Sequence, residues 1–236
     1  MLTIEDKERF VHSSIRLEFT KETDHIEEMF ELFTKCYKFV HEHEDDVLPD
    51  AEDYAKWSTF LLFIRNFRVL RVAHHSMLKG YNEVSIAVQR LAFENHLLMF
   101  FFMFRPEEAK EWWSGKRIGL RRLKREARKR LSYDEVYAEL SKLVHANIET
   151  TRFFWKPHGE GMVTWTTDVI PADFYWALQG LLTLGIATLL GIIPTIFGEE
   201  FQEEPLVKEI KEFNVSSKRI LKDISEKLRA EIEKEG

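Results

Sequence analysis

The chain has 236 residues, of which 44% are hydrophobic and 31% charged; this composition indicates a folded protein with a sizeable core and excludes an intrinsically disordered chain. A formal net charge of -6 argues against nucleic-acid binding by the whole surface, although a local basic patch could still bind. The single cysteine, Cys36, excludes an internal disulfide and a cysteine-rich zinc site. Because the charged N-terminus lacks the apolar run of a signal peptide, we expect a cytoplasmic protein.

The first half of the chain predicts three long helices in succession. Apolar side chains recur every three or four positions over about residues 21 to 44, which is typical of one buried helix face. After a break, Asp50 is the expected N-cap of a second helix that extends to about Leu78. Gly80 separates it from a third helix, residues 81 to 104, which Pro106 ends.

The second half continues with a short turn, a basic helix at residues 116 to 130 and a further helix capped by Ser132. Two β-prone runs then flank the turn-forming sequence KPHGEG, which predicts one β-hairpin over 151–168 packed on the helices. A charged amphipathic helix at about 215–235 ends the chain. We therefore predict a single all-α, bundle-like domain, residues 1 to 236, with a β-hairpin insertion.

The segment 174–198 contains no Asp, Glu, Lys, Arg or His and is long enough to cross a membrane. Three glycines thin its side chains, Pro194 divides it, and polar Gln and Thr side chains interrupt it. The other predicted helices are amphipathic and need an apolar partner to bury their faces. We therefore expect the central core helix of a bundle, with a membrane span as the alternative.

The sequence YAELSKLVHAN places Tyr137, Ser141 and His145 at successive i, i+4 positions, on one face of a predicted helix. A histidine in such a setting can act as a general base or contact nucleic acid. Alternatively, His145 and Asn147 satisfy backbone groups where the helix ends, which would make them a structural latch.

A second candidate site lies in the third helix, where Arg90 and Glu94 are spaced i, i+4 in an otherwise apolar segment. Buried charges require partners, so the simplest interpretation is one intrahelical ion pair. The alternative places both residues with His145 around one cavity, where Glu94 orients the imidazole and Arg90 binds an anion.

A third candidate site lies in the second helix, where Arg68, Arg71 and His75 share one face. Two guanidinium groups beside an imidazole suit a phosphodiester, because the cations can hold the phosphate while histidine transfers a proton. The alternative is a solvated polar face opposite the apolar side chains of the same helix.

The basic helix is the fourth candidate, because residues 116 to 130 carry nine Lys or Arg against Glu126 alone. Such a stripe could follow a phosphate backbone, or it could pair with acidic side chains of this chain or of a partner. The predicted anion-binding residues are Arg117, Arg121, Lys124, Arg125 and Arg128.

Metal-ligand patterns are weak in this sequence. In HEHEDD, His41 to Asp46, neighbouring side chains of a helix point apart, so few could bind one ion. Glu22-x-x-His25 occurs once, whereas a di-iron bundle requires the motif twice. We therefore expect no metal site and no cofactor.

Two segments together resemble a set of uncharacterised prokaryotic all-helical proteins: RLAFEN, 90–95, with its Arg-x-x-x-Glu pattern, and YAELSKLVHAN with its Ser-x-x-x-His pattern. Some of those proteins are similar to the HEPN superfamily, which includes RNA-cleaving toxins and defence proteins. That resemblance implies an active Arg and His separated by four to six residues. Arg68 and His75 fit this spacing on one helix face, whereas His74 points away from Arg68 in a regular helix. Arg90 and His96 point apart in the same way.

We therefore expect a soluble, HEPN-like factor that binds or cleaves RNA or another polyanion. If it is an enzyme, the first hypothesis is a metal-independent ribonuclease. Two other interpretations stay open: a non-enzymatic protein-interaction module, and a membrane-associated protein anchored by 174–198. The aromatic content of 19 Phe and 6 Trp is also compatible with a homo-oligomer.

Overall fold

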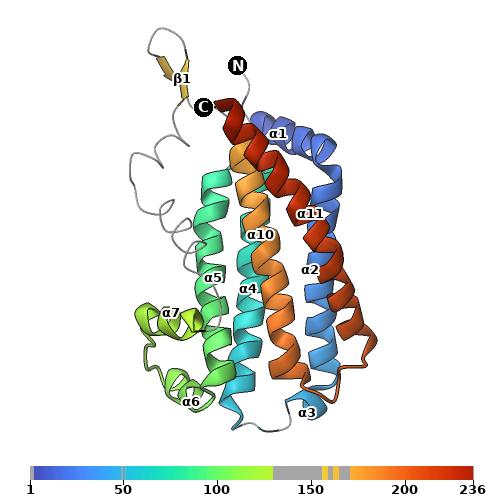
Figure 1. The fold of residues 1–236 in the computed structure, drawn as a ribbon, viewed down its shortest axis with the longest axis vertical. Coiled ribbons are helices and arrows are strands. Elements are labelled where there is room, and N and C mark those ends of the chain that lie inside the picture. Colours follow the sequence, from blue (N-terminus) through green and yellow to red (C-terminus); the bar gives the residue numbers. More distant parts are fainter. Residues whose placement is uncertain are drawn as a thin grey trace.

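The computed structural model of the protein describes residues 3–48, 50, 52–129, 156–158, 162–164 and 171–235 (Figure 1). The described part is dominated by helices, which confirms the all-α prediction. The helices are α1 (Ile4–Glu18), α2 (Thr20–Glu42), α3 (Glu44–Val47), α4 (Tyr54–Leu78), α5 (Asn82–Phe104), α6 (Glu107–Trp113), α7 (Leu120–Arg128), α10 (Pro171–Ile192), the π-helix η1 (Ile193–Phe197) and α11 (Pro205–Glu235). Two short strands are β1 (Lys156–His158) and β2 (Met162–Thr164).

The five long helices α2, α4, α5, α10 and α11 form a bundle, with α10 in the middle (Figure 1). Helix α10 packs against α2, α4, α5 and α11. Helix α1 lies across one end of the bundle, whereas α6 and α7 lie beside the opposite end of α5. Within the described residues, one helical segment, Phe174–Phe197, has the length and apolar composition to cross a membrane, and most of it is buried in the bundle.

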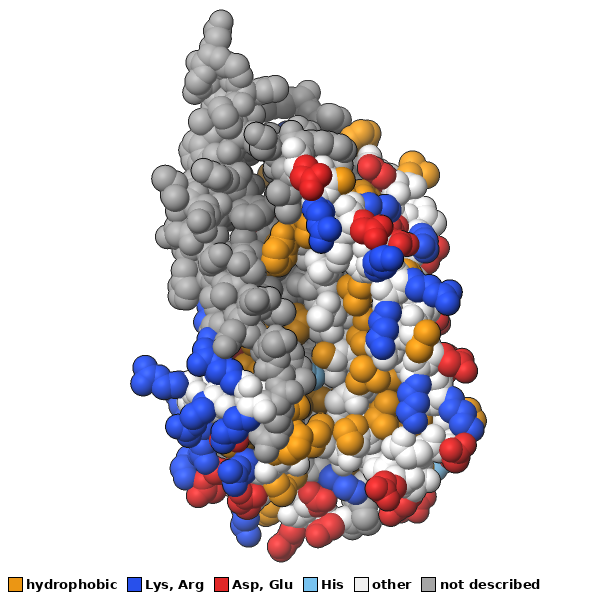
Figure 2. All heavy atoms as spheres, viewed as in Figure 1, with side chains coloured by type: hydrophobic (Ala, Val, Ile, Leu, Met, Phe, Trp, Pro, Cys, Tyr) orange, Lys and Arg blue, Asp and Glu red, His pale blue; other side chains and the backbone are white. Residues whose placement is uncertain are grey.

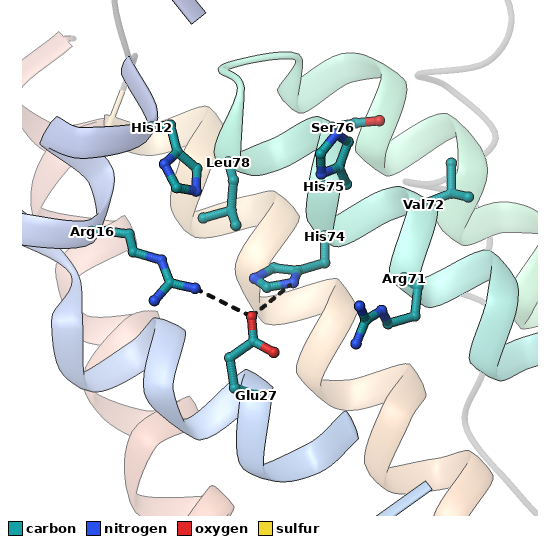
Figure 3. A pocket seen from close by; sticks show the side chains of 9 residues that line it. All are labelled: His12, Arg16, Glu27, Arg71, Val72, His74, His75, Ser76 and Leu78. Atoms are coloured by element: carbon teal, nitrogen blue, oxygen red, sulfur yellow. Dashed lines mark hydrogen bonds and ion pairs between the residues drawn. The ribbon is translucent and has the colours of Figure 1, made fainter. Parts of the chain in front are cut away.

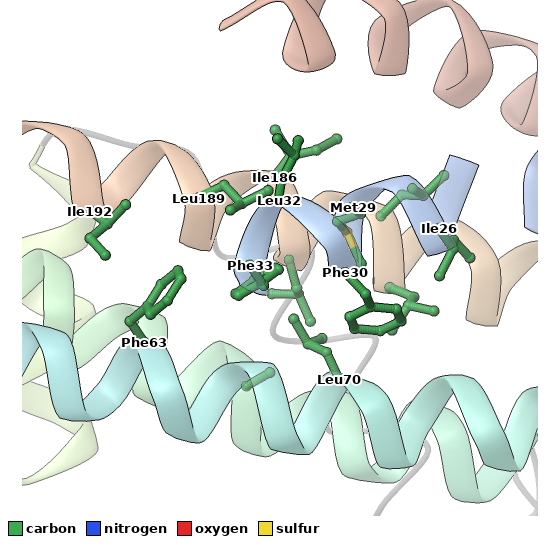
Figure 4. Close-up of a cluster of buried hydrophobic side chains, with 14 of the residues drawn as sticks. Ile26, Met29, Phe30, Leu32, Phe33, Phe63, Leu70, Ile186, Leu189 and Ile192 are labelled. Atoms are coloured by element: carbon green, nitrogen blue, oxygen red, sulfur yellow. The ribbon is translucent and has the colours of Figure 1, made fainter. Parts of the chain in front are cut away.

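Side chains of α2, α4 and α10 interlock at the centre of the bundle (Figure 4). The ring of Phe33 on α2 stacks on Phe63 of α4, with the ring centroids 4.9 Å apart. Leu189 and Ile192 of α10 are fully buried in the same cluster. Since burial of one such side chain contributes about 1.5–3 kcal/mol, the surface of α10 is a main source of the bundle's stability.

The start of α4 differs from the sequence prediction. Its N-cap is Asp53, whose carboxylate accepts a hydrogen bond from the backbone N–H of Lys56 at 3.1 Å. The predicted N-cap, Asp50, instead accepts from the N–H of Glu52 at 2.7 Å, in the loop before the helix. Both carboxylates make local hydrogen bonds typical of caps and turns, so the sequence pattern did not decide between them.

Several boundaries and elements were not predicted. Helices α1 and α6 are present in segments for which the sequence analysis predicted no helix. Helix α11 begins at Pro205, ten residues before the predicted start near 215, because its first turns bury Val207 and Ile210 against the bundle. On α4, Leu61 is 44% exposed, whereas the neighbouring Leu62 and Phe63 face the core.

The strands β1 and β2 pair antiparallel, with Pro157 opposite Val163. The remainder of the predicted hairpin at 151–168 lies outside the described residues, as does the helix predicted after Ser132.

A chain of buried polar side chains ties three helices together. The Nδ2 of Asn95 on α5 donates to Oδ1 of Asn66 on α4 at 2.8 Å, and the Nδ2 of Asn66 donates to Oγ1 of Thr188 on α10 at 3.0 Å. The Thr188 hydroxyl donates to the carbonyl of Leu184 at 2.7 Å. Every member is buried, so the loss of one would leave its neighbour without a partner in an apolar interior.

Replacing Thr188 by Val exchanges the hydroxyl for a methyl group of similar size and leaves the amide of Asn66 without its acceptor. We expect the free energy of unfolding to fall by about 1–3 kcal/mol, measured by urea denaturation with an unchanged m-value. Thr183→Val is the matched control, because Thr183 is exposed on the same helix and should change stability by less than about 0.5 kcal/mol. Equal effects of the two substitutions would show that the buried hydrogen bonds do not hold α10 to α4.

Candidate functional site

A pocket of about 480 Å³, open to solvent, lies between α1, α2 and the C-terminal part of α4 (Figure 3). Its wall is rich in cationic and imidazole side chains from α1 and α4, and α2 contributes one carboxylate. The lining residues are His12 and Arg16 of α1, Glu27 of α2, and Arg71, Val72, His74, His75, Ser76 and Leu78 of α4.

Helix α1 is fixed on the bundle by contacts at the turn between α4 and α5. The carboxylate of Glu8 pairs with the Nζ of Lys79 at 2.8 Å and accepts a hydrogen bond from the Tyr81 hydroxyl at 2.8 Å. Gly80 has a φ of +85°, and a Cβ at this position would crowd the buried Val11 of α1. This docking brings His12 and Arg16 to the pocket, one helical turn apart.

Glu27 lies at the junction of the three helices in the pocket (Figure 3). Its Oε1 is 3.4 Å from Nη2 of Arg16 and 3.8 Å from Nδ1 of His74. With neutral histidines, Arg16 and Arg71 against Glu27 leave a formal charge of +1. The pocket therefore favours an anion, and a bound anion would compete with Glu27 for Arg16.

Burial controls the protonation of His74. Desolvation, followed by the positive charges of Arg71 and Arg16, lowers the pKa of His74 to about 4. The imidazole is therefore neutral at pH 7 and packs 5.5 Å from the ring of Phe30. Arg71 lies over the same ring, with its guanidinium carbon 5.2 Å from the centroid, so Phe30 supports both pocket residues.

The exposed members of the pocket are those that can reach a ligand. Arg71 and His75 are exposed on α4, and His12 is half-buried on α1. Guanidinium groups bind phosphate oxygens through paired N–H donors, whereas imidazoles can accept or donate a proton near neutral pH. The arrangement is therefore suited to binding a phosphate group and transferring protons at it.

The structure separates the three α4 residues that were predicted to form one site. Arg71 and His75 line the pocket together, whereas Arg68 lies one turn earlier, exposed and outside the lining. His74, which the helix geometry directs away from Arg68, lines the pocket from its buried side.

Sequence reasoning missed the α1 and α2 side of the pocket, namely His12, Arg16 and Glu27. One signal was present: Thr3 and Asp6 form a capping box at the start of α1, and this pattern marks a helix N-terminus in a sequence. A helix starting there places His12 and Arg16 on one face.

The second predicted site is only partly within the described residues. The Nε of Arg90 is 3.1 Å from Oε1 of Glu94, so the expected intrahelical ion pair is present. His145, Tyr137 and Ser141 lie outside the described residues, as does Asn147. A shared cavity of Arg90, Glu94 and His145 therefore stays a prediction.

The basic helix is confirmed as α7, with a buried apolar face that includes Leu123 and Ala127. Arg122 on the inner side pairs with both carboxylate oxygens of Glu108 and lies over the ring of Phe101. Lys and Arg side chains gather at this corner of the molecule (Figure 2). Of the predicted anion-binding residues, Lys124 is half-buried and four are exposed: Arg117, Arg121, Arg125 and Arg128.

The pocket and α7 lie at opposite ends of the bundle (Figure 1). Helix α5 begins beside the end of α4 that forms the pocket, and α7 packs near Phe101 at the far end of α5. At 1.5 Å per residue, Asn82 and Phe101 are about 28 Å apart along the helix axis. A phosphate backbone that follows α7 would therefore lie about this distance from the pocket.

Both residues of the Glu22-x-x-His25 motif make contacts that hold helices together. The Nε2 of His25 is 2.7 Å from the hydroxyl of Ser217, and Lys227 pairs with the buried Glu22 at 2.7 Å, which ties α2 to α11. In the part of the chain that the structure describes, no group of three or more His, Cys, Asp or Glu side chains is placed to hold a metal ion.

Comparisons with known proteins identify no relative of this chain. No protein-family model, curated protein or solved structure matches this chain.

The low pKa of His74 predicts a loss of stability in mild acid. Below its ordinary pKa of 6.5, the unfolded chain binds a proton at this imidazole that the folded protein excludes until about pH 4. Stability should therefore fall as the pH drops from 6.5 towards 4, by on the order of 2 kcal/mol at pH 5. His96, which burial also holds at a pKa of about 4, should add a similar loss.

Urea denaturation at pH 7, 6 and 5 measures this dependence. His74→Gln should show a shallower loss than the wild-type protein, because one of the contributing imidazoles is absent. His41→Gln, at an exposed ring of α2, is the matched control and should keep the wild-type dependence. If His74→Gln loses as much stability between pH 7 and 5 as the wild type, the imidazole is not held neutral in the pocket.

Proposed function

We propose that this protein is a HEPN-like, cytoplasmic RNA-binding and RNA-cleaving factor whose phosphodiester site is the pocket between α1, α2 and α4. The observation that carries the proposal is the convergence of Arg16, Arg71, His12 and His75 on one open cavity from two helices that are distant in sequence. A solvated polar face of a single helix would not require this convergence.

The proposed reaction is transfer of the RNA 3′-phosphodiester to the neighbouring 2′-hydroxyl. An imidazole takes the proton of the 2′-hydroxyl, whose oxygen forms a bond to phosphorus while the bond to the 5′-oxygen breaks. A second imidazole donates a proton to the departing 5′-oxygen. His75 and His12 are assigned these two tasks, since they line the pocket from opposite helices and are less buried than His74.

The arginines supply charge stabilisation. Arg71 and Arg16 would hold the phosphate oxygens and stabilise the negative charge that builds up on them as the bond to the 2′-oxygen forms. Arg71 is already oriented by its contact with Phe30, whereas Arg16 would exchange Glu27 for the phosphate.

A protein-interaction module or a homo-oligomer is the second candidate, and α1 favours it. Phe10 and Leu17 lie seven residues apart on this helix and are 73% and 83% exposed. Large apolar side chains exposed on one face are frequent in protein interfaces. The membrane-associated alternative has less support, because α10 is covered by four helices. Purification without detergent tests it directly.

The hairpin insertion at 151–168 also belongs to this proposal. The antiparallel pairing of β1 with β2 supports it. Its tryptophans, Trp155 and Trp165, lie outside the described residues and have no assigned role.

The central experiment is single-turnover cleavage of a labelled single-stranded RNA. His75→Ala should lower the rate at least about 10²-fold, the typical contribution of a general acid or base. Its free energy of unfolding should change by less than about 0.5 kcal/mol, because the side chain is exposed. His43→Ala, an exposed histidine at the far end of α2, is the matched control and should cleave at the wild-type rate.

Other results of the cleavage experiment would assign the site to other residues or change the proposed activity. Loss of cleavage in His145→Ala but not in His75→Ala would move the site to Arg90 and Glu94. Binding without cleavage in the wild type would leave an RNA-binding factor, and neither binding nor cleavage at low salt would remove RNA from the proposal.

Glu27 gives a second test that does not depend on turnover. Glu27→Gln removes the carboxylate that competes for Arg16, so inorganic phosphate should bind about fivefold more tightly, corresponding to about 1 kcal/mol. Glu31→Gln, an exposed carboxylate one turn further along α2, is the control and should leave the affinity unchanged. Calorimetry measures both, and unchanged affinity in Glu27→Gln would contradict an anion site at this position.

A further inference from the structure

Helix α4 carries an unusual charge distribution for a protein with a net charge of -6. Its 25 residues, Tyr54–Leu78, contain no Asp or Glu, although they contain Lys56, three arginines and two histidines. Three of these cations, Arg65, Arg68 and Arg71, follow one another at intervals of three residues. The pattern is a row of positive charge along one helix.

The row lies on the outer surface of α4. Arg65, Arg68, Arg71 and His75 are all exposed. At 100° per residue they fall within about 120° of one another, so they share one side of the helix. Among the residues that the structure describes, none of the three arginines is paired with a carboxylate.

Unpaired like charges at this spacing oppose helix stability by about 0.2–0.5 kcal/mol for each neighbouring pair. Several cations elsewhere on the surface do have a carboxylate partner, as Arg122 has Glu108 and Lys116 has Glu111. Arg71 has a stabilising contact with the ring of Phe30. Within the described residues Arg65 and Arg68 have no such contact, and a ligand that supplies negative charge accounts for them.

The row leads directly into the pocket. Arg71 belongs to both, and Arg68 and Arg65 extend from it towards the N-terminus of α4. From His75 to Arg65 the helix rises about 15 Å. Phosphates of one stacked strand repeat about every 3.4 Å along its axis, so this length corresponds to about four nucleotide steps.

We propose that the outer face of α4 binds one RNA strand, whose phosphates lie along Arg65, Arg68 and Arg71 and whose scissile phosphate enters the pocket. The inference rests on the proposed function, in which the polyanion is RNA. It adds Arg65 to the binding residues and gives the bound strand a path along α4 rather than across α7.

A single strand fits these observations better than a membrane or an acidic protein. A lipid surface requires a broad basic plane with inserted apolar side chains, whereas here the cations form one file that ends in a concave pocket. Leu61 and Val72 are exposed on the same face of α4, where they can make apolar contacts with bases or riboses.

Salt dependence of binding tests the path. The probe is a fluorescein-labelled strand of twelve 2′-O-methyl uridines, which lacks the attacking hydroxyl and so reports binding without cleavage. Each phosphate contact in a single strand contributes about -0.7 to the slope of log K against log salt. The double variant Arg65→Gln/Arg68→Gln should reduce the slope by about 1.4 and weaken binding roughly 25-fold at 0.1 M salt.

Two controls accompany this measurement. Lys218→Gln/Arg219→Gln removes two exposed cations from α11 and should leave slope and affinity unchanged. The melting temperature of Arg65→Gln/Arg68→Gln should equal or exceed that of the wild type, since glutamine is a good helix former and the repulsion is relieved. A smaller slope of log K against log salt in an α4 variant that is still folded then reports the loss of phosphate contacts.

The possible outcomes separate the path from the function. A reduced slope only in the α4 variant supports the path. If Arg121→Gln/Arg125→Gln of α7 reduces the slope and the α4 variant does not, the strand lies on α7 and the path is wrong while RNA binding stands. If the wild type binds phosphatidylserine vesicles but not the RNA, or binds neither, both the path and the proposed function are overturned.

Discussion

Burial of α10 is the constraint on which the rest of this structure depends. The helix carries no charged side chain from Phe174 to its end, and it is enclosed by α2, α4, α5 and α11. Small residues allow this enclosure, because a side chain at Gly180 would collide with Gln89 of α5 and one at Gly185 with Met29 of α2. Each surrounding helix therefore turns one face inwards and leaves its opposite face available for charge.

The charged outer faces are not equivalent at the two ends of the bundle. Around α7 several cations pair with a carboxylate, as Lys129 does with Glu126. Arg122 is part of the packing through Glu108 and Phe101. At the α1, α2 and α4 junction, Glu27 is the only carboxylate among the described residues that line the pocket. The excess positive charge therefore lies at the pocket. Proteins tend to depart from locally stable charge arrangements at functional sites, so this location is consistent with a binding site.

His74 connects the core to this pocket. It is buried in the packed interior beside Phe30, yet it faces Glu27 across 3.8 Å. Its low pKa keeps it uncharged next to the arginines, so the positive charge of the pocket comes from groups that can move towards a ligand. The core thus determines the electrostatics of the surface site through the burial of one imidazole.

The sequence by itself determined the all-α class, the extents of α2, α4 and α5 to within a few residues, the basic helix and the Arg90–Glu94 ion pair, because periodicity and i, i+4 spacing are local properties. It also placed Arg71 and His75 on one face. Only the tertiary structure decided that His12, Arg16 and Glu27 complete that site, that Arg68 stays outside it, and that α7 lies at the other end. Those outcomes depend on how helices distant in sequence pack against one another, and no local pattern specifies which faces meet.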